Sequence, residues 1–489
     1  MLGVVLPAFG AFVLAAVAVL IVALVAAAAS RWPGKAFNFQ LLLVTVASAG
    51  TIMLSSSAVR VGDAAMAAEV TAESDGGIFA KMLLIAAVGV AVSLCAAWVF
   101  RFRKAWSAPC RFQSRGLLPP TDIAVAFLVY YVSFSILPIL FGQSFFFHVS
   151  LIYPFFVFLA LFLWVQVSTV DPVVVFKRSL GLLALGSLAA AIFFPQYVMD
   201  LHYVGLVPGV NFRLWGITAT PNTLGSVACV LLVLEVAVPS ERLWVRNSLV
   251  LGCVITLLMS QSKTSIAATF VGVAIIISWR LIAKMRQFSV SSDSNEKLIA
   301  TVVLALASGS FALVGFWLMF VDLSVFSGLE NKLNAQAVGD LRTATGRTWI
   351  WSVAVQAGLE NPLFGQGAGF WSFENRQKWG LSGAVHAHNL YLQAFSRAGL
   401  VGLLSLLVFL YFLVRYSVRA AKPTNGGSIA LLVVFMIRSI SEVPIEPNAI
   451  LGGEFFAVMA FIFYVVDRGA RPLEAAMQTS AQAPEVLKA

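Results

Sequence analysis

The residues best suited to acid–base chemistry stand close together near position 387. His386 and His388 are two of only four histidines in 489 residues, and an apolar helix is predicted to begin directly after them at Asn389. An ordinary imidazole changes its charge near neutral pH, so a histidine fixed at a helix start can act as a general base. We therefore favour His388 as the base. A capping role is its alternative, and His386 fits an exposed loop histidine.

Zinc binding is a second interpretation of these residues. Two histidines separated by one residue, together with His202, offer ligands that zinc prefers. The sequence shows no cysteine and no clear acidic residue beside them. We therefore favour proton transfer, and we expect neither a metal nor another cofactor.

Three cations are candidates for binding an anion. Arg213 precedes a predicted helix start at Asn222, Lys263 lies in the short link SQSKTS, and Arg347 heads another predicted helix. Arginine forks and lysine point charges are common phosphate binders, and the helix starts at Asn222, Thr264 and Arg347 add backbone N–H donors. Each cation taken alone could be a charge that snorkels to the membrane interface. All three stand beside turns, which favours a shared anion site.

The elements that position these residues are membrane helices. Hydrophobic residues make up 60% of the chain and charged residues 11%, against roughly 45–50% and 25% in soluble domains. The mean hydropathy is +0.92. Apolar runs long enough to cross a bilayer recur from end to end. The first of them lacks a basic n-region and a convincing cleavage site, so we expect a retained span. The composition indicates an all-α, polytopic integral membrane protein.

About thirteen spans are predicted, and twelve or fourteen are also compatible with the pattern. They lie near 4–29, 37–58, 79–100, 121–142, 146–167, 179–196, 222–239, 247–261, 264–281, 298–321, 389–414, 428–441 and 449–466. We divide the chain into N-terminal helices (1–196), a core (197–410), C-terminal helices (411–466) and a frayed cytoplasmic tail (467–489).

The loop charges predict the orientation. Every odd-numbered span is followed by Lys or Arg, whereas the loop 59–78 carries four acidic residues against Arg60 alone. Basic loops favour the cytoplasm, so the N-terminus and the even loops are expected outside. The net charge of +10 is then mostly an orientation signal and does not indicate a nucleic-acid partner. None of the four cysteines, Cys95, Cys110, Cys229 and Cys253, lies in an outside loop, so no disulfide is expected.

Two outside segments are long enough to carry a site, 197–221 and 322–388. The second contains a predicted amphipathic helix, Gly346 to Glu360, that lies on the membrane surface or caps the bundle. A glycine-rich stretch, PLFGQGAGFW, follows it. No Lys-Ser/Thr pair accompanies these glycines, which favours a turn over a nucleotide cradle.

Several motifs resemble the O-antigen ligase and polymerase superfamily. His388-Asn389 followed by Gly399-Leu400-Val401-Gly402 resembles its signature. FRLWGITATPN resembles its arginine-bearing loop, SQSKTS its basic link, and TGRTWIW with NPLFGQGAGF the start of its large periplasmic loop. The resemblance spans about 197–410 in matching order.

This resemblance implies a GT-C-type glycosyltransferase in a bacterial inner membrane, with its site facing the periplasm. The implied donor is a glycan on undecaprenyl diphosphate, and the acceptor is another glycan or lipid A-core. His388 would be the base, and Arg213 and Arg347 would hold the diphosphate. Lys263 replaces an arginine that is frequent in the family. Supporting roles fall to Asn389, His386, Asn222, Gly399 and Gly402.

Three activities remain open. The TGRTW and SQSKT motifs resemble those of exopolysaccharide polymerases slightly more, which favours a polymerase. An O-antigen ligase would share the same donor site. A polysaccharide or lipid transporter is the alternative of another class. The long outside loop, the lack of internal repeats and the few charges within spans count against a transporter.

Overall fold

The computed structural model describes residues 27–28, 31–55, 78–105, 121–165, 168–201, 203, 211–288, 347–381, 384–446 and 453–481. Nearly all of them are helical. The longer helices are α2 (Pro33–Ser55), α4 (Ile78–Ala105), α5 (Thr121–Tyr131), α7 (Tyr153–Trp164), α8 (Pro172–Phe193), α10 (Pro221–Ala237), α11 (Leu243–Ser260), α12 (Lys263–Phe288), α15 (Arg347–Glu360), α17 (Leu390–Arg419), α18 (Gly427–Ser441) and α19 (Glu454–Ala481).

Short elements join these helices. A π-helical turn η2 (Val132–Ile136) connects α5 to α6 (Leu137–Phe141). The others are η3 (Val149–Leu151), α9 (Pro195–Val198), the strands β1 (Met199–Asp200) and β2 (Arg213–Leu214), and α16 (Phe373–Lys378). The two strands pair antiparallel, with Asp200 opposite Arg213.

The polytopic helical architecture is as predicted. Among the described residues, seven helical segments are long and apolar enough to cross a membrane, and α7, α10 and α18 are shorter apolar helices. The predicted spans 4–29 and 298–321 lie outside the described residues, so the total of thirteen remains a prediction.

Two boundaries differ from the prediction for identifiable reasons. α8 begins at Pro172, because the Asp171 side chain caps it by accepting a hydrogen bond from the Val173 N–H. Lys177 therefore lies within the helix rather than in a loop. The predicted frayed tail is helical as far as Ala481, in keeping with the high helix propensity of its alanines.

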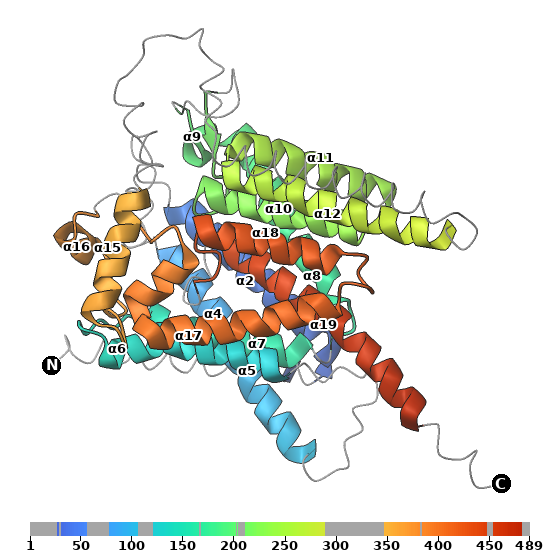
Figure 1. The fold of residues 1–489 in the computed structure, drawn as a ribbon, viewed down its shortest axis with the longest axis horizontal. Helices are drawn as coiled ribbons and strands as arrows, with labels where there is room; N and C mark the ends of the chain where they lie inside the picture. The colour runs from blue at the N-terminus through green and yellow to red at the C-terminus, as the bar shows by residue number, and fades with distance from the viewer. Residues whose placement is uncertain are drawn as a thin grey trace, which may run out of the picture.

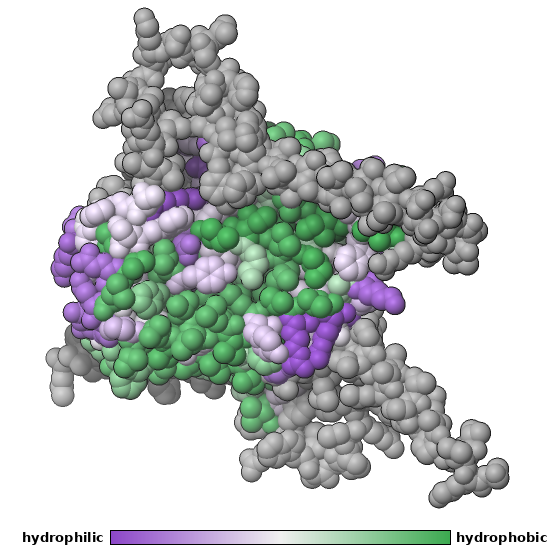
Figure 2. All heavy atoms as spheres, viewed as in Figure 1, coloured by the Kyte–Doolittle hydropathy of each residue, from purple (hydrophilic) through white to green (hydrophobic). Residues whose placement is uncertain are grey.

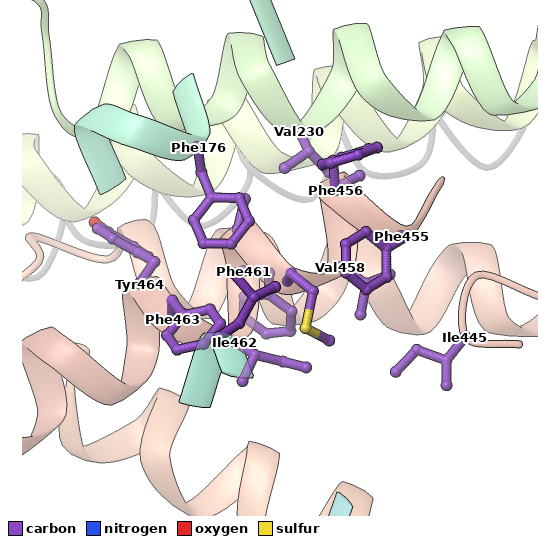
Figure 3. Packing of buried hydrophobic residues seen from close by; sticks show 14 of the residues in the cluster. Phe176, Val230, Ile445, Phe455, Phe456, Val458, Phe461, Ile462, Phe463 and Tyr464 are labelled. Carbon is purple, nitrogen blue, oxygen red and sulfur yellow. The ribbon is translucent and has the colours of Figure 1, made fainter. Parts of the chain in front are cut away.

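α19 runs through the centre of the bundle. Every residue from Phe455 to Val466 is buried, and Figure 3 shows its aromatic side chains packed against Phe176 and Val230 of neighbouring helices. The Phe463 ring stacks on Phe176, with centroids 5.4 Å apart. A helix that is apolar on all sides belongs inside a protein, and this one packs against α8, α10, α17 and α18.

α17 is interrupted at Gly399, whose φ of 61° and ψ of −155° are not helical. The glycine-rich turn predicted after α15 fills this interruption through four backbone hydrogen bonds: Gln366 N to Ser396 O, Gly367 N to Arg397 O, Leu400 N to Pro362 O and Val401 N to Leu363 O. A Cβ on Gly399 would lie 2.4 Å from the Leu363 backbone. Gly402 is equally confined, since its Cβ would lie 2.3 Å from that of Ala398. The turn therefore ties the outer segment to a membrane helix.

The helices run in roughly the same direction, and α15 crosses one end of them (Figure 1). Figure 2 shows a hydrophobic band over the middle of the visible face, with polar residues gathered at its two ends, near α15 and near the end of α17. This distribution is the one expected of a bundle that spans a bilayer.

α15 caps the bundle, as one of the two predicted alternatives has it. It is not amphipathic, because apolar side chains lie on both its buried and its exposed sides. Its buried side consists of Val353, Ala354, Ala357 and Gly358, and Gly358 lies against the ring of Phe395 in α17. Large apolar side chains also stand on its open side, where Trp349 and Leu359 are 59% and 63% exposed. The small residues permit close packing on α17, and an apolar surface remains uncovered.

Candidate functional site

Arg213 is held at the end of the bundle that α15 crosses. The pairing of β2 with β1 fixes its backbone. Its Nε donates to the carbonyl oxygen of Ser260 at 3.0 Å, and its Nη2 donates to Oδ1 of Asn222 at 2.8 Å. Its guanidinium also lies 5.0 Å from the ring centroid of Tyr203. Arg213 thus joins the start of α10 to the link between α11 and α12.

Asn222 links Arg213 to an acidic residue, Glu442. It lies in the first turn of α10, where the Thr220 side chain caps the helix by accepting from the Thr223 N–H. The Asn222 Nδ2 group donates to Oε1 of Glu442 at 2.8 Å. Glu442 follows the last residue of α18, and only 7% of its side chain is exposed.

Arg347 and His388 contact the same carboxylate. Nη2 of Arg347, at the head of α15, lies 3.1 Å from Oε1 of Glu442. Nδ1 of His388 lies 3.1 Å from Oε2. The Arg347 and His388 side chains remain 24% and 23% exposed. Segments far apart in the sequence therefore meet at Glu442, and we call Arg213, Asn222, Arg347, His386, His388 and Glu442 the Glu442 cluster.

The backbone around His388 is held in an uncommon conformation. His388 has a positive φ of 46°, which non-glycine residues adopt infrequently. Asn389 then caps α17, as its Oδ1 accepts from the Tyr391 and Leu392 N–H groups, and its Nδ2 donates to the Ile440 carbonyl at 3.2 Å. This contact joins the start of α17 to the end of α18. It explains in physical terms why the His-Asn pair stands at this position.

His386 is a partner of His388 rather than the exposed loop residue that we predicted. Its ring lies 4.2 Å from that of His388, centroid to centroid, and its Nδ1 accepts a hydrogen bond from the His388 N–H at 3.1 Å. The pKa of His386 is lowered to about 3. Burial is the largest cause, and the nearby His388 is the next. His386 is therefore neutral at physiological pH and carries its proton on Nε2, since Nδ1 is the acceptor.

Glu442 is ionised in this setting. Burial alone would raise the pKa of its carboxyl group, but the hydrogen bond from His388 and the positive charge of Arg347 hold that pKa well below its usual range. A permanent carboxylate favours a proton on the Nδ1 of His388, which leaves its Nε2 to accept a proton from elsewhere.

Lys263 lies in the same neighbourhood. It is the first residue of α12 and stands three residues after Ser260, whose carbonyl oxygen binds Arg213. The link SQSKTS is pinned at a second point, because Gln261 Nε2 donates to the Phe212 carbonyl at 2.6 Å. The three predicted cations thus come from segments that meet at one end of the bundle.

The structure corrects one premise about metal binding. Glu442 supplies the acidic neighbour that the sequence did not reveal, and His386, His388 and Glu442 have possible ligand atoms within 4.8 Å of one another. These ligand types suit zinc. However, the Arg347 guanidinium already binds the same carboxylate, and its positive charge opposes a cation there. His202 lies outside the described residues.

Glu442 directly follows the predicted span 428–441 and was not singled out from the sequence. The general signal was present, since ionisable residues near or within apolar segments are expensive and mark sites or pairs. The same signal marks Arg438, whose Nη2 lies 2.7 Å from Glu454, and Arg397, whose Nη1 lies 3.1 Å from Glu446. The charges of the C-terminal helices are thus few, and each of these two arginines is paired with a carboxylate.

Comparison with known proteins bears on this same region. Residues 248–407 match the family described as O-antigen ligase. The chain is also similar to the exopolysaccharide production protein ExoQ of Rhizobium meliloti (strain 1021), with 28% identity over 163 residues. That similarity covers 32% of this chain and 34% of ExoQ, so this chain matches about a third of the relative's length. Residues 248–407, which match the O-antigen ligase family, include α12, α15, His386, His388 and most of α17.

Proposed function

Because residues 248–407 place this chain in an O-antigen ligase and polymerase-like family, we propose that it is a membrane glycosyltransferase of the GT-C type. It takes a glycan from undecaprenyl diphosphate and transfers it to a sugar hydroxyl during surface polysaccharide assembly. The protein resides in a bacterial inner membrane, and the Glu442 cluster faces the periplasm.

The observation that carries this proposal is the sharing of one carboxylate by a histidine and an arginine. His388 Nδ1 and Arg347 Nη2 each lie 3.1 Å from Glu442, on different oxygens. A base and an anion-binding cation therefore stand side by side, with both side chains about a quarter exposed. Such a pairing suits glycosyl transfer from a diphosphate, because one substrate loses a proton while the other gains negative charge.

His388 is the general base in this proposal. Its Nε2 removes the proton of the acceptor hydroxyl as the acceptor oxygen forms a bond to the anomeric carbon of the donor sugar. Its Nδ1–H donates to Glu442, which orients the ring and stabilises the imidazolium that forms. Glu442 does not touch substrate and is a positioning residue. Attack opposite the leaving group inverts the anomeric centre.

The cations stabilise the leaving group. The bond between the anomeric carbon and the diphosphate oxygen breaks, and the diphosphate takes the electron pair. An arginine has five N–H donors. Two groups of Arg213 are used in the contacts with Ser260 and Asn222, and one of Arg347 in the contact with Glu442. The remaining donors, with Lys263, are proposed to bind the phosphate oxygens without a metal ion.

We favour a polymerase over a ligase. The similarity to an exopolysaccharide production protein agrees with the resemblance of the TGRTW and SQSKT motifs to those of exopolysaccharide polymerases. An O-antigen ligase remains the second candidate, since the matched family is described by that activity. Both activities would use the same donor site and would differ in the acceptor.

The acceptor decides between them. The purified chain in nanodiscs receives lipid-linked repeats alone, or together with lipid A-core. Longer lipid-linked glycans in the first sample support polymerase activity, and glycosylated lipid A-core only in the second supports ligase activity. If the chain moves intact lipid-linked glycan across a vesicle membrane without forming a glycosidic bond, it is a transporter and the proposal is wrong.

The proposed orientation has its own test. A cysteine at Ser372, near α16, should react with an impermeant maleimide in intact spheroplasts. A cysteine at Lys422, beyond the opposite end of α17, should react only after lysis. The reverse pattern would overturn the periplasmic placement of the Glu442 cluster.

A further inference from the structure

A nearly apolar groove runs along α15 beside the Glu442 cluster. Its volume is about 760 Å³, within the range of roughly 300–1,000 Å³ that small-molecule sites occupy. Its lining comes from two adjacent rows of α15 and from one residue of α17, namely Trp351, Val355, Leu359, Ser352, Gln356, Glu360 and Leu392. Val355 and Leu359 are 38% and 63% exposed, so the groove is open at the surface.

The groove is aligned with Arg347. Arg347, Trp351, Val355 and Leu359 recur every four residues, so they form one row on the surface of α15. At 1.5 Å per residue, Leu359 lies roughly 18 Å along the helix from Arg347. A single row of one helix therefore begins with a cation at the Glu442 cluster and continues as an apolar track.

The groove is also attached to the catalytic segment. Trp351 Nε1 donates a hydrogen bond to the Ala387 carbonyl at 3.0 Å, and Ala387 precedes His388. Leu392, on the other wall, lies in the first turn of α17. The start of the groove is thus fixed relative to His388.

The polar edge of the groove offers little to a peptide. Gln356 Nε2 donates to Glu360 at 3.3 Å, and the other Glu360 oxygen accepts from Gln366 at 3.1 Å. These groups bind one another. An extended peptide would need free hydrogen-bond partners for its backbone, whereas a hydrocarbon chain needs none.

Resting on the proposed function, we propose that this groove holds the first isoprene units of the lipid donor. The diphosphate then lies at Arg347 and the attached prenyl chain lies along Trp351, Val355 and Leu359. A molecule with an anionic head and an apolar tail matches a row that has a cation at one end and apolar residues beyond it. The groove thereby adds affinity for the donor beyond its contacts with the diphosphate, while the geometry at the anomeric carbon is set by the Glu442 cluster.

The test compares two donors that differ only in their tails. One carries the glycan on undecaprenyl diphosphate, and the other carries the same glycan on a butyl diphosphate ester. Val355→Trp fills the groove, and Leu359→Gln makes it polar. We expect both variants to raise KM for the undecaprenyl donor about tenfold while kcat and all parameters for the butyl donor stay unchanged. Trp349→Gln, an exposed residue of α15 outside the groove, is the matched control and should behave as wild type.

A binding experiment keeps this proposal separate from the proposed function. A benzophenone-bearing geranyl diphosphate, which carries no glycan, should label the α15 groove or Leu392 in the wild-type protein, and Val355→Trp should abolish that labelling. Labelling that persists in Val355→Trp, or a crosslink at Leu359 between two copies of the chain, would overturn the groove proposal. Wild type that transfers glycan while its groove variants keep wild-type KM would also overturn it and leave the proposed function intact. Specific labelling of the groove in a protein that transfers no glycan would support the groove proposal and overturn the proposed function.

Discussion

Two buried carboxylates near opposite ends of the bundle differ in how much accessible hydrogen-bonding capacity their partners have left. Near one end Glu235, 1% exposed, pairs with Lys177, 7% exposed. The Lys177 ammonium also donates to the Val238 carbonyl and the Ser240 hydroxyl, so all three of its N–H donors have oxygen partners. At the other end the Glu442 side chain is also buried, at 7% exposed, yet Arg347 and His388 remain about a quarter exposed.

This difference separates a structural ion pair from a candidate site. The Lys177–Glu235 pair ties the end of α10 to α8, and Ser240 donates to both oxygens of Glu235 through its N–H and its hydroxyl. The Glu442 carboxylate instead holds side chains whose outer atoms remain accessible. The burial of a charge therefore does not identify a functional site, whereas unused and accessible hydrogen-bonding capacity around the charge does.

The largest expected effect is the loss of the base. His388→Ala should lower turnover by about 10²–10⁴-fold, the usual contribution of a general base, while binding of the lipid-linked donor is retained. His386→Ala should cost much less, because His386 is neutral and supports His388 through a backbone hydrogen bond and ring contact without taking the acceptor proton. Single-turnover kinetics with separate donor-binding measurements would check this. Equal losses in the two variants would contradict the assignment of the base.

Removal of a cation should come next. Arg347→Ala or Arg213→Ala should lower turnover by about 10²–10³-fold, the range found when a group that stabilises developing charge is deleted. Arg→Lys should rescue only partly, since the planar fork is lost. The readout is kcat/KM with a lipid-diphosphate glycan. Wild-type activity in either alanine variant would remove that residue from the site.

Lys177→Met should affect stability rather than catalysis. Removal of one partner from a buried pair costs about 3–5 kcal/mol, because the other charge is left uncompensated. The matched double variant Lys177→Met with Glu235→Gln should recover most of this loss. Unfolding in detergent would measure it, with kcat of the surviving folded protein as the control. A large fall in kcat of the folded protein would show that the two ends are not separate in function.

The smallest expected effect is that of chelation. Turnover should be unchanged in EDTA, because cationic side chains are proposed to neutralise the leaving group. A preparation that loses activity in EDTA and regains it with zinc would make His386, His388 and Glu442 metal ligands. The base assignment would then be wrong.

The membrane class and most helices were predictable because they depend on local composition. Long apolar runs mark spans, and the His-Asn pair marked the start of α17. The Glu442 cluster was only partly predictable. Its cations could be proposed from their turns, but Glu442 acquires its role because α18 ends beside the starts of α10, α15 and α17, which is a tertiary fact. The interruption at Gly399 was likewise visible as a glycine, but the strand-like contact that fills it was not.

The buried course of α19 has a consequence for biosynthesis. This helix follows every other described helix in chain order, yet its aromatic side chains are buried among those of earlier helices (Figure 3). While the chain is being made, α8, α10 and α17 enter the membrane without the surface against which they will pack. Their final arrangement waits until α19 has left the ribosome. A chain that ends before Glu454 would thus leave the faces of α8, α10 and α17 that pack against α19 uncovered, and such exposed apolar surface favours misassembly.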